Sequence, residues 1–183
     1  VSALPGGRGD GVPLPTLIDV QDGARILASF AGSDDTKVAI VTTQGMGFSC
    51  KASDLQSRVK AGKSFVNLAA GDTLLKVAQI TDHDLYLACL ASDGRLLNFP
   101  LVELKELSSG GKGVILIALD EKATLLDIMP NDGVALLVQH TARGGKAQEL
   151  RLSGSNLQPF VSSRAKKGKV IDCVQSGYTM NDE

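Results

Sequence analysis

Three stretches of the chain share one order of apolar and turn positions. Each stretch places an apolar run before a glycine turn and a second apolar-rich run after it: 38–41, Gly45 and 47–50; then 85–90, Gly94 and 96–99; then 134–138, Gly144 and 148–152. The turn glycines are 49 and 50 residues apart. Two apolar runs around a glycine turn are typical of a β-hairpin, because glycine accepts positive φ without Cβ strain. The pattern predicts three antiparallel hairpins.

A second set of short motifs, here called the boxes, combines glycine with lysine or arginine in phase with the hairpins. The boxes are residues 8–12, 62–66, 111–114 and 166–170. Aligned on Gly11, Ser64, Gly113 and Gly168, they are 53, 49 and 55 residues apart. A period near 50 residues is typical of propeller-like arrays in which each repeat is a small sheet. The expected repeats are approximately 1–59, 60–108 and 109–163, with a terminal partial repeat at 164–183.

The composition agrees with an all-β fold. The 183 residues are 43% hydrophobic and 21% charged, as in an ordinary folded domain. Helical periodicity is short, and no apolar run reaches the ~18 residues needed to cross a bilayer. The chain begins with Val1 and contains a box within its first dozen residues, so we expect it to be a fragment of one larger domain.

The residues that usually carry metal or nucleophile chemistry are sparse. Cys50, Cys89 and Cys173 are odd in number and widely spaced, which favours free thiols in a reducing cytosol. His83 and His140 have no partners at metal-ligand spacing, so no metal site is expected. The sequence around Gly62-Lys63-Ser64 lacks the first glycine of a phosphate-binding P-loop, and an apolar strand-like run follows it.

The charge is balanced overall but unevenly distributed. The formal net charge is −1, yet residues 9–35 hold five acids and one base, whereas residues 141–169 hold seven bases and one acid. In a circular array, equivalent boxes project toward equivalent parts of the rim, where lysine neutralises a phosphate and glycine lets it approach backbone N–H groups. The residues predicted to face this anion are Arg8, Lys60, Lys63, Lys112, Arg143, Lys146, Arg164, Lys166, Lys167 and Lys169.

These segments together resemble the C-terminal domain of the A subunit of DNA topoisomerase IV, which is related to that of gyrase A. The resemblance covers nearly the whole chain and rests on the order and spacing of segments 7–14, 44–48, 54–55, 58–63, 94–100 and 107–113. The gyrase branch has an intact basic box of the form Gln-Arg-Arg-Gly-Gly-Lys-Gly. The nearest segment here is Ser109-Gly110-Gly111-Lys112-Gly113, which favours the topoisomerase IV branch.

The resemblance implies an all-β β-pinwheel, a partial ring of four-stranded antiparallel blades that exchange strands. It implies a bacterial domain that binds and bends double-stranded DNA for ATP-dependent strand passage in decatenation, supercoil relaxation and chromosome segregation. The cleavage tyrosine, Mg²⁺ and ATP would belong to other parts of an A2B2 heterotetramer with the topoisomerase IV B subunit, so this chain would be non-catalytic and need no cofactor. The expected location is cytoplasmic and nucleoid-associated, with possible peripheral association at the inner face of the membrane.

Three alternatives remain open from the residues alone. The chain could be a gyrase A C-terminal domain that wraps DNA. It could be a propeller-like protein-interaction module, whose acidic loops engage a basic partner. It could also be a propeller enzyme such as a glycosidase, which would need acids that converge in a funnel, whereas the carboxylates here are scattered among loops.

Overall fold

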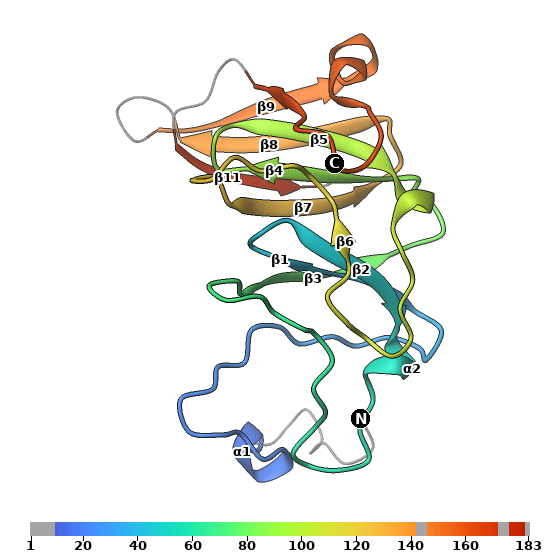
Figure 1. The fold of residues 1–183 in the computed structure, drawn as a ribbon, viewed down its shortest axis with the longest axis vertical. Coiled ribbons are helices and arrows are strands. Elements are labelled where there is room, and N and C mark those ends of the chain that lie inside the picture. The colour runs from blue at the N-terminus through green and yellow to red at the C-terminus, as the bar shows by residue number, and fades with distance from the viewer. Residues whose placement is uncertain (1–9, 142–145, 172–175, 182–183) are drawn as a thin grey trace.

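The architecture is all-β, with three antiparallel sheets stacked along the long axis of the molecule (Figure 1). The computed structural model describes residues 10–141, 146–171 and 176–181, so Arg8, Arg143, Gly144 and Cys173 lie outside the described residues. The strands are β1 (Lys37–Thr42), β2 (Met46–Lys51), β3 (Leu74–Ile80), β4 (Tyr86–Ala91), β5 (Arg95–Pro100), β6 (Val114–Ile115), β7 (Leu125–Asn131), β8 (Ala135–Thr141), β9 (Ala147–Ser153), β10 (Lys169–Val170) and β11 (Ser176–Asn181). The helical elements are single turns: α1 (Leu14–Leu17), α2 (Ala52–Leu55), η1 (Leu101–Glu103), η2 (Gly154–Asn156) and η3 (Gln158–Phe160).

The three hairpins predicted from the apolar runs are present as β1–β2, β4–β5 and β8–β9. Gly45 and Gly94 hold the first two turns with φ of 73° and 79°, the left-handed conformation that glycine adopts without Cβ strain. The third predicted turn glycine, Gly144, falls outside the described residues.

Each sheet adds strands from later in the chain to one of these hairpins. The first sheet has the order β3-β1-β2-β6, the second β10-β5-β4-β7, and the third, within the described residues, β11-β8-β9. The sheets therefore do not coincide with box-to-box segments. β6 belongs to the first sheet although β4 and β5, which precede it in the chain, belong to the second. Strand exchange of this kind makes each sheet depend on its neighbour.

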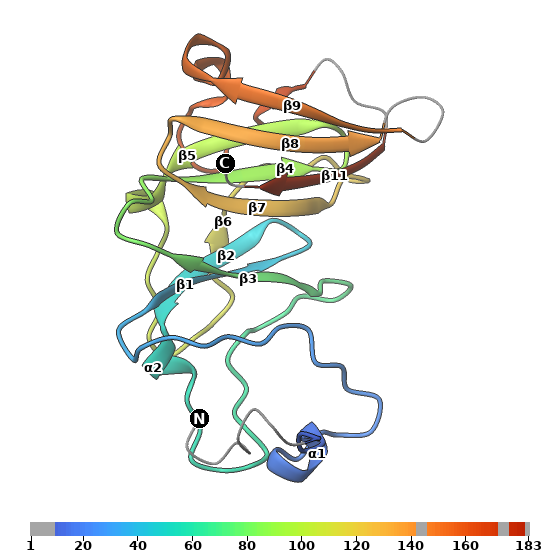
Figure 2. The same ribbon diagram turned by 180° about the vertical axis from the view of Figure 1, so that it is seen from behind.

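Two apolar layers lie between the stacked sheets and hold them together; Figure 2 shows the stack of sheets from behind. The layer between the first and second sheets contains Val41, Leu87 and Phe99, and the layer between the second and third contains Leu90, Met129 and Val138. Because both faces of the second sheet are covered, β4 is buried from Leu87 to Ala91 and shows no polar alternation. A third cluster around Phe48 covers the far face of the first sheet.

A polar junction connects all three sheets on the side where β3, β7 and β11 lie next to one another. The carboxylate of Asp127, buried on β7, accepts a hydrogen bond from Lys76 Nζ of β3 at 2.7 Å and another from the backbone N–H of Met180 of β11 at 2.8 Å. Lys76 Nζ also donates to the carbonyl of Ile128 at 3.0 Å. Asp127 thus satisfies donors from both neighbouring sheets, which fixes their position relative to the second sheet.

Candidate nucleic-acid interface

The third and fourth boxes, 111–114 and 166–170, lie at the sheet edges opposite this junction. β6, which directly follows Gly113, pairs with β2 at the free edge of the first hairpin. β10, which directly follows Gly168, pairs with β5 at the corresponding edge of the second. The strands β3 and β7 occupy the other edges of the same two sheets. Lys112 and the cluster 164–169 therefore lie on equivalent outer edges, as their shared column in the sequence predicts.

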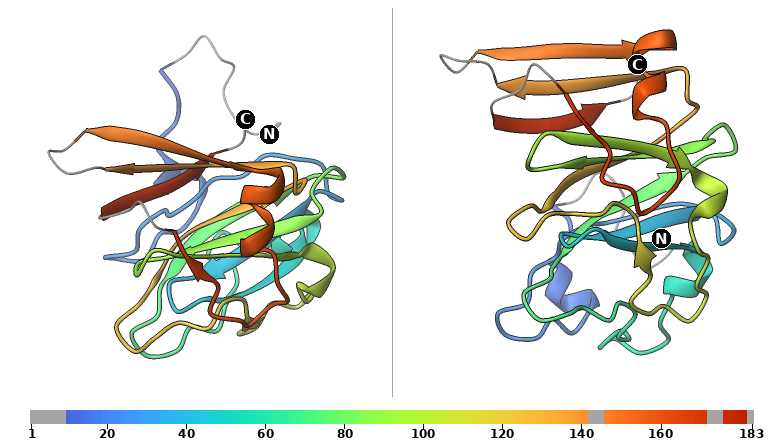
Figure 3. Two further views of the ribbon diagram at one scale, coloured as in Figure 1. Left: turned by 90° about the horizontal axis from the view of Figure 1, so that it is seen from above. Right: turned by 45° about the horizontal axis from the view of Figure 1, so that its top comes forward.

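Backbone hydrogen bonds connect the third and fourth boxes to the end of the preceding box or to the segment just after it. Gly111 N–H donates to the carbonyl of Phe65, and Asn67 N–H donates back to Gly111, at 2.9 and 3.0 Å. One repeat later, Ala118 N–H donates to the carbonyl of Lys166 at 3.0 Å. The boxes thus follow one another along one side of the stack, where the chain segment through β10 runs beside β5 (Figure 3).

The structure corrects the alignment of the second box. Gly11, Gly62, Gly113 and Gly168 all have left-handed φ, at 79°, 71°, 78° and 71°. Asn67 N–H donates to Gly111 and Ala118 N–H donates to Lys166, so Asn67 and Ala118 occupy equivalent positions in consecutive repeats. These two residues are 51 positions apart, as are Gly62 and Gly113. Gly62, and not Ser64, is therefore the equivalent position, which makes the spacings 51, 51 and 55 residues.

Two of the recurring glycines, Gly113 and Gly168, are required by the protein's own packing. A Cβ on Gly113 would lie 2.4 Å from the carbonyl oxygen of Gly47, and one on Gly168 would lie 2.4 Å from that of Leu96. Both contacts are far shorter than any real Cβ contact, and the left-handed φ adds strain for every other residue. The expectation that these glycines serve the approach of a phosphate is replaced by a structural role in seating β6 and β10.

Five predicted DNA-binding lysines remain exposed and make no ion pair within the described part of the chain: Lys60, Lys112, Lys146, Lys166 and Lys169. Lys112 and Lys169 flank the glycines that seat the edge strands. Lys146 lies at the start of β9, away from the two described box strands in sequence and sheet. A free ammonium on a surface edge is available to neutralise an anion without first losing a partner.

The other predicted cations already have partners. Lys63 Nζ donates to the carbonyl of Asp54 and lies 5.1 Å from the centre of the Phe65 ring. Lys167 Nζ donates to Asp120 Oδ1 at 2.5 Å, and both side chains are about half exposed. Arg164, which is half-buried, donates from its guanidinium to the carbonyl of Ile115 and from its backbone N–H to Glu103.

A hollow of about 420 Å³ opens between η3 and the last box. Its polar lining comes from Gln158, Ser162 and three box lysines: Lys166, Lys167 and Lys169. Hydroxyl, amide and ammonium donors around one concave surface are the groups that proteins direct at phosphate oxygens. Three lysines thus line one side of this hollow.

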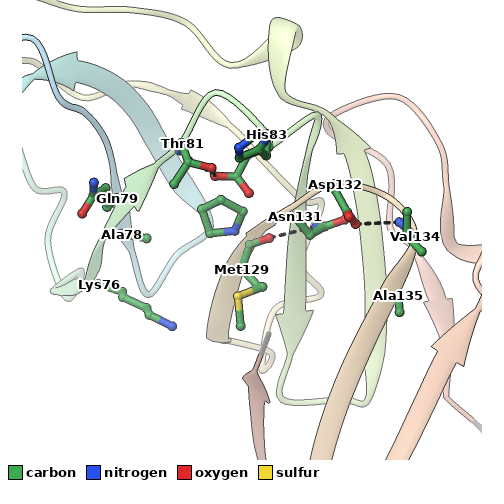
Figure 4. Close-up of a pocket in the computed structure, with 12 residues that line it drawn as sticks. Lys76, Ala78, Gln79, Thr81, His83, Met129, Asn131, Asp132, Val134 and Ala135 are labelled. Atoms are coloured by element: carbon green, nitrogen blue, oxygen red, sulfur yellow. Dashed lines mark hydrogen bonds between the residues drawn. The ribbon is translucent and has the colours of Figure 1, made fainter. Parts of the chain in front are cut away.

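A larger hollow of about 630 Å³ lies where β3 and β7 meet (Figure 4). Its charged groups are used internally: Lys76 is bonded to Asp127, Asp84 accepts from Thr81, and Asp132 accepts from the N–H of Val134. A glycosidase needs two carboxylates that converge on a substrate and are free to transfer protons. The two carboxylates that line this hollow instead stabilise turns.

Cys50 and Cys89 are free and buried, which confirms the prediction for these two thiols. Burial raises the pKa of Cys50 to about 11, and burial also raises the pKa of Cys89. Both thiols are therefore protonated at neutral pH and lack the thiolate that nucleophilic chemistry requires.

Two segments of the chain match a known family model. The model of the DNA gyrase C-terminal domain, a β-propeller, matches residues 36–81 and 85–132, which is just over half of the chain. The chain belongs to the DNA gyrase C-terminal domain family. The first matched segment encloses β1 to β3, and the second encloses β4 to β7, so the family model covers two of the three hairpins seen here.

Curated relatives extend the match along almost the whole chain. The A subunit of DNA topoisomerase 4 from Neisseria gonorrhoeae is 31% identical over 92% of this chain and 22% of its own length. The protein of the same name from Salmonella typhimurium is 32% identical over 94% of this chain and 23% of its own length. The chain therefore spans less than a quarter of the length of these relatives.

Solved structures confirm the predicted β-pinwheel. The structure titled E. coli ParC C-terminal domain matches with a TM-score of 0.84 and 26% identity over 98% of this chain and 74% of that one. The DNA gyrase A C-terminal domain matches in fold with a TM-score of 0.65, at 19% identity over 80% of this chain and 49% of that one. The resemblance to the C-terminal domain of the topoisomerase IV A subunit is thus confirmed, and the fold is a partial, unclosed pinwheel. No helix among the described residues is long and apolar enough to cross a membrane.

Proposed function

We propose that this chain is the DNA-binding and DNA-bending domain of a topoisomerase IV A subunit. The observation that carries the proposal is the placement of unpaired lysines beside the seated glycines on equivalent outer edges of consecutive sheets. A duplex that follows these edges would meet cationic groups at regular intervals and bend around the stack. Family membership supports this assignment, because relatives named for topoisomerase IV share almost the whole chain.

The expected mode of binding is electrostatic and tolerant of sequence. Lysines on an exposed sheet edge reach phosphates, which are the same for every base pair, whereas sequence readout requires side chains in a groove. The acidic segment 10–36 lies at the end of the stack away from β9 (Figure 1), so the low net charge of the chain is compatible with a local cationic edge. The domain would hold a duplex for strand passage carried out elsewhere in the enzyme.

In this proposal, the catalytic groups belong to other parts of an A2B2 assembly with the topoisomerase IV B subunit. Within the described residues, no three His, Cys, Asp or Glu side chains are grouped so that they could hold a metal ion. We assign no step on this chain to Mg²⁺ or ATP. Cleavage and ATP hydrolysis would take place outside it.

Fluorescence anisotropy with labelled duplexes of a few tens of base pairs tests binding, and energy transfer between labels at the two ends tests bending. We expect affinity that falls steeply with salt and is similar for unrelated sequences, together with a shorter end-to-end distance in the complex. Binding to a basic protein, with no affinity for DNA, would instead support a protein-interaction module.

A further inference from the structure

Lys112 and Lys167 occupy the same position in consecutive boxes but have different surroundings. Each directly precedes the glycine that seats an edge strand, Gly113 or Gly168. Lys167 Nζ lies 2.5 Å from Asp120 Oδ1, whereas Lys112 makes no ion pair with any described residue. The position equivalent to Asp120, 51 residues earlier, is Ala69. One acidic side chain therefore distinguishes the two sites.

The backbone holds Asp120 in register with the last box. Two residues before it, Ala118 N–H donates to the carbonyl of Lys166, the residue preceding Lys167. The carbonyl of Asp120 itself accepts from Ala123 N–H at 2.9 Å and closes a turn. The hydrogen bond from Lys167 and its charge lower the pKa of Asp120, so the carboxyl group stays ionised at neutral pH. The pair is thus positioned by the strands around it.

We propose that Asp120 competes with DNA for Lys167 and so weakens the phosphate contact of the last box relative to that of Lys112. This inference rests on the proposed DNA-binding function. A phosphate that takes Lys167 must first displace Asp120, and the released carboxylate then lies close to the DNA backbone. The contact with Lys112 has no such cost, because the side chain of Ala69 is uncharged. Asp120 would therefore set how strongly the duplex is held at this end of the track.

The test compares Asp120→Asn with Glu121→Gln in the 183-residue chain, because both remove one negative charge and Glu121 is an exposed neighbour with no ion pair among the described residues. Anisotropy with one labelled duplex across a range of KCl concentrations gives the affinity and the salt slope. Asp120→Asn should tighten binding by about 1.5- to 5-fold beyond Glu121→Gln, the range expected for an exposed ion pair. It should also steepen the slope by ~0.9, because Lys167 becomes a full phosphate contact.

A second comparison places Asp120→Asn in a Lys167→Gln background, where the proposal predicts no gain beyond that of Glu121→Gln in the same background. Equal effects of Asp120→Asn and Glu121→Gln, or a gain that persists without Lys167, would overturn the competition and leave only a general charge effect. Failure of the proposed function would look different, because the unchanged chain would then show no salt-dependent binding to the duplex. Circular dichroism of every variant verifies that the fold is retained.

Discussion

The inner side of the stack, where β3, β7 and β11 meet, and the outer side, where β6 and β10 lie, use polar residues in opposite ways. On the inner side, Lys76 and Asp127 satisfy one another and the backbone of β11, so their charges hold three sheets in position. On the outer side, Lys112, Lys166 and Lys169 are exposed and unpaired within the described residues. Charge thus serves the fold where it is buried and paired, and in our proposal it serves DNA binding where it is repeated and left free.

The boxes themselves contain both kinds of residue. Their glycines belong to the fold, because Gly113 and Gly168 allow β6 and β10 to approach the backbone of the neighbouring strand. Their lysines point to function, because an exposed ammonium adds little to stability. Substitutions of the glycines in one box should therefore change stability, whereas substitutions of its lysines should change DNA binding.

The largest effect is expected from Gly113→Ala or Gly168→Ala. Each new Cβ would lie 2.4 Å from a carbonyl oxygen, and each backbone has left-handed φ. Backbone strain and overpacking together should lower the free energy of unfolding by about 2–5 kcal/mol. Gly62→Ala is the matched control, because its φ is equally left-handed and its Cβ would meet nothing within 4 Å; it should cost about 1–2 kcal/mol. Equal losses in urea unfolding would show that close approach does not matter.

Asp127→Ala tests the inner junction. The substitution leaves Lys76 and the N–H of Met180 without their acceptor, and unfolding should become easier by about 2–4 kcal/mol, less than for a fully buried pair because Lys76 is partly exposed. Asp132→Ala removes an exposed turn carboxylate and should cost about 1 kcal/mol or less. Any variant that still folds should keep the salt slope for DNA. A junction variant with unchanged stability but altered slope would contradict the division between inner and outer sides.

Lys112→Glu should weaken binding to unrelated duplex sequences alike, by roughly fivefold in low salt, because it replaces a phosphate contact with a repulsive charge. Its stability should stay within about 0.5 kcal/mol of the unchanged chain, as for other exposed positions. Anisotropy with several duplexes measures the loss, and chemical unfolding measures the stability. A loss confined to one sequence would indicate base readout at this position.

The smallest effect concerns the thiols of the core. Because burial raises the pKa of Cys50 to about 11 and also raises that of Cys89, their thiolate fractions at pH 8 are small and reagent access is blocked. In a Cys173→Ser background, the native chain should show almost no reaction with Ellman's reagent, and two thiols should react in denaturant. Rapid reaction in the native state would mean that the layers between the sheets open easily.

The sequence was sufficient to predict the hairpins and the existence of the boxes, because both depend on neighbouring residues. The apolar runs around Gly45 and Gly94 specify local strand pairing. Backbone positions with left-handed φ favour glycine, so glycine recurs in the boxes. Aligning the second box on Ser64 was wrong because the motif is short and could be aligned in more than one way. The backbone φ that identifies Gly62 as the equivalent residue cannot be read from the sequence. Sequence periodicity also could not show that Gly113 and Gly168 lie against the backbone of a neighbouring strand.

The polar pairs could not be predicted because their partners are distant in the chain. Asp120 meets Lys167 across 47 residues, and Lys76 meets Asp127 across 51. The second separation equals the spacing between Gly62 and Gly113, so aligning repeats on the glycines would have placed Lys76 and Asp127 in one column. No such signal exists for Asp120, whose counterpart is Ala69. Strand exchange has to be known before this contact can be inferred.

The central claim is that the free box lysines hold DNA, and the salt slope of binding tests it most directly. The triple variant Lys112→Gln, Lys166→Gln and Lys169→Gln should flatten the slope of log K against log salt by up to ~2.7, at ~0.9 for each phosphate contact. Lys37 and Lys51 lie at the ends of β1 and β2, where they pair with Glu106 and Asp35, and Lys105 precedes the third box. The control triple variant Lys37→Gln, Lys51→Gln and Lys105→Gln loses the same charge as the first variant. It should change the slope by less than one contact. Equal flattening by the two variants, or an unchanged slope in the first with its fold intact, would show that the duplex does not follow the boxes.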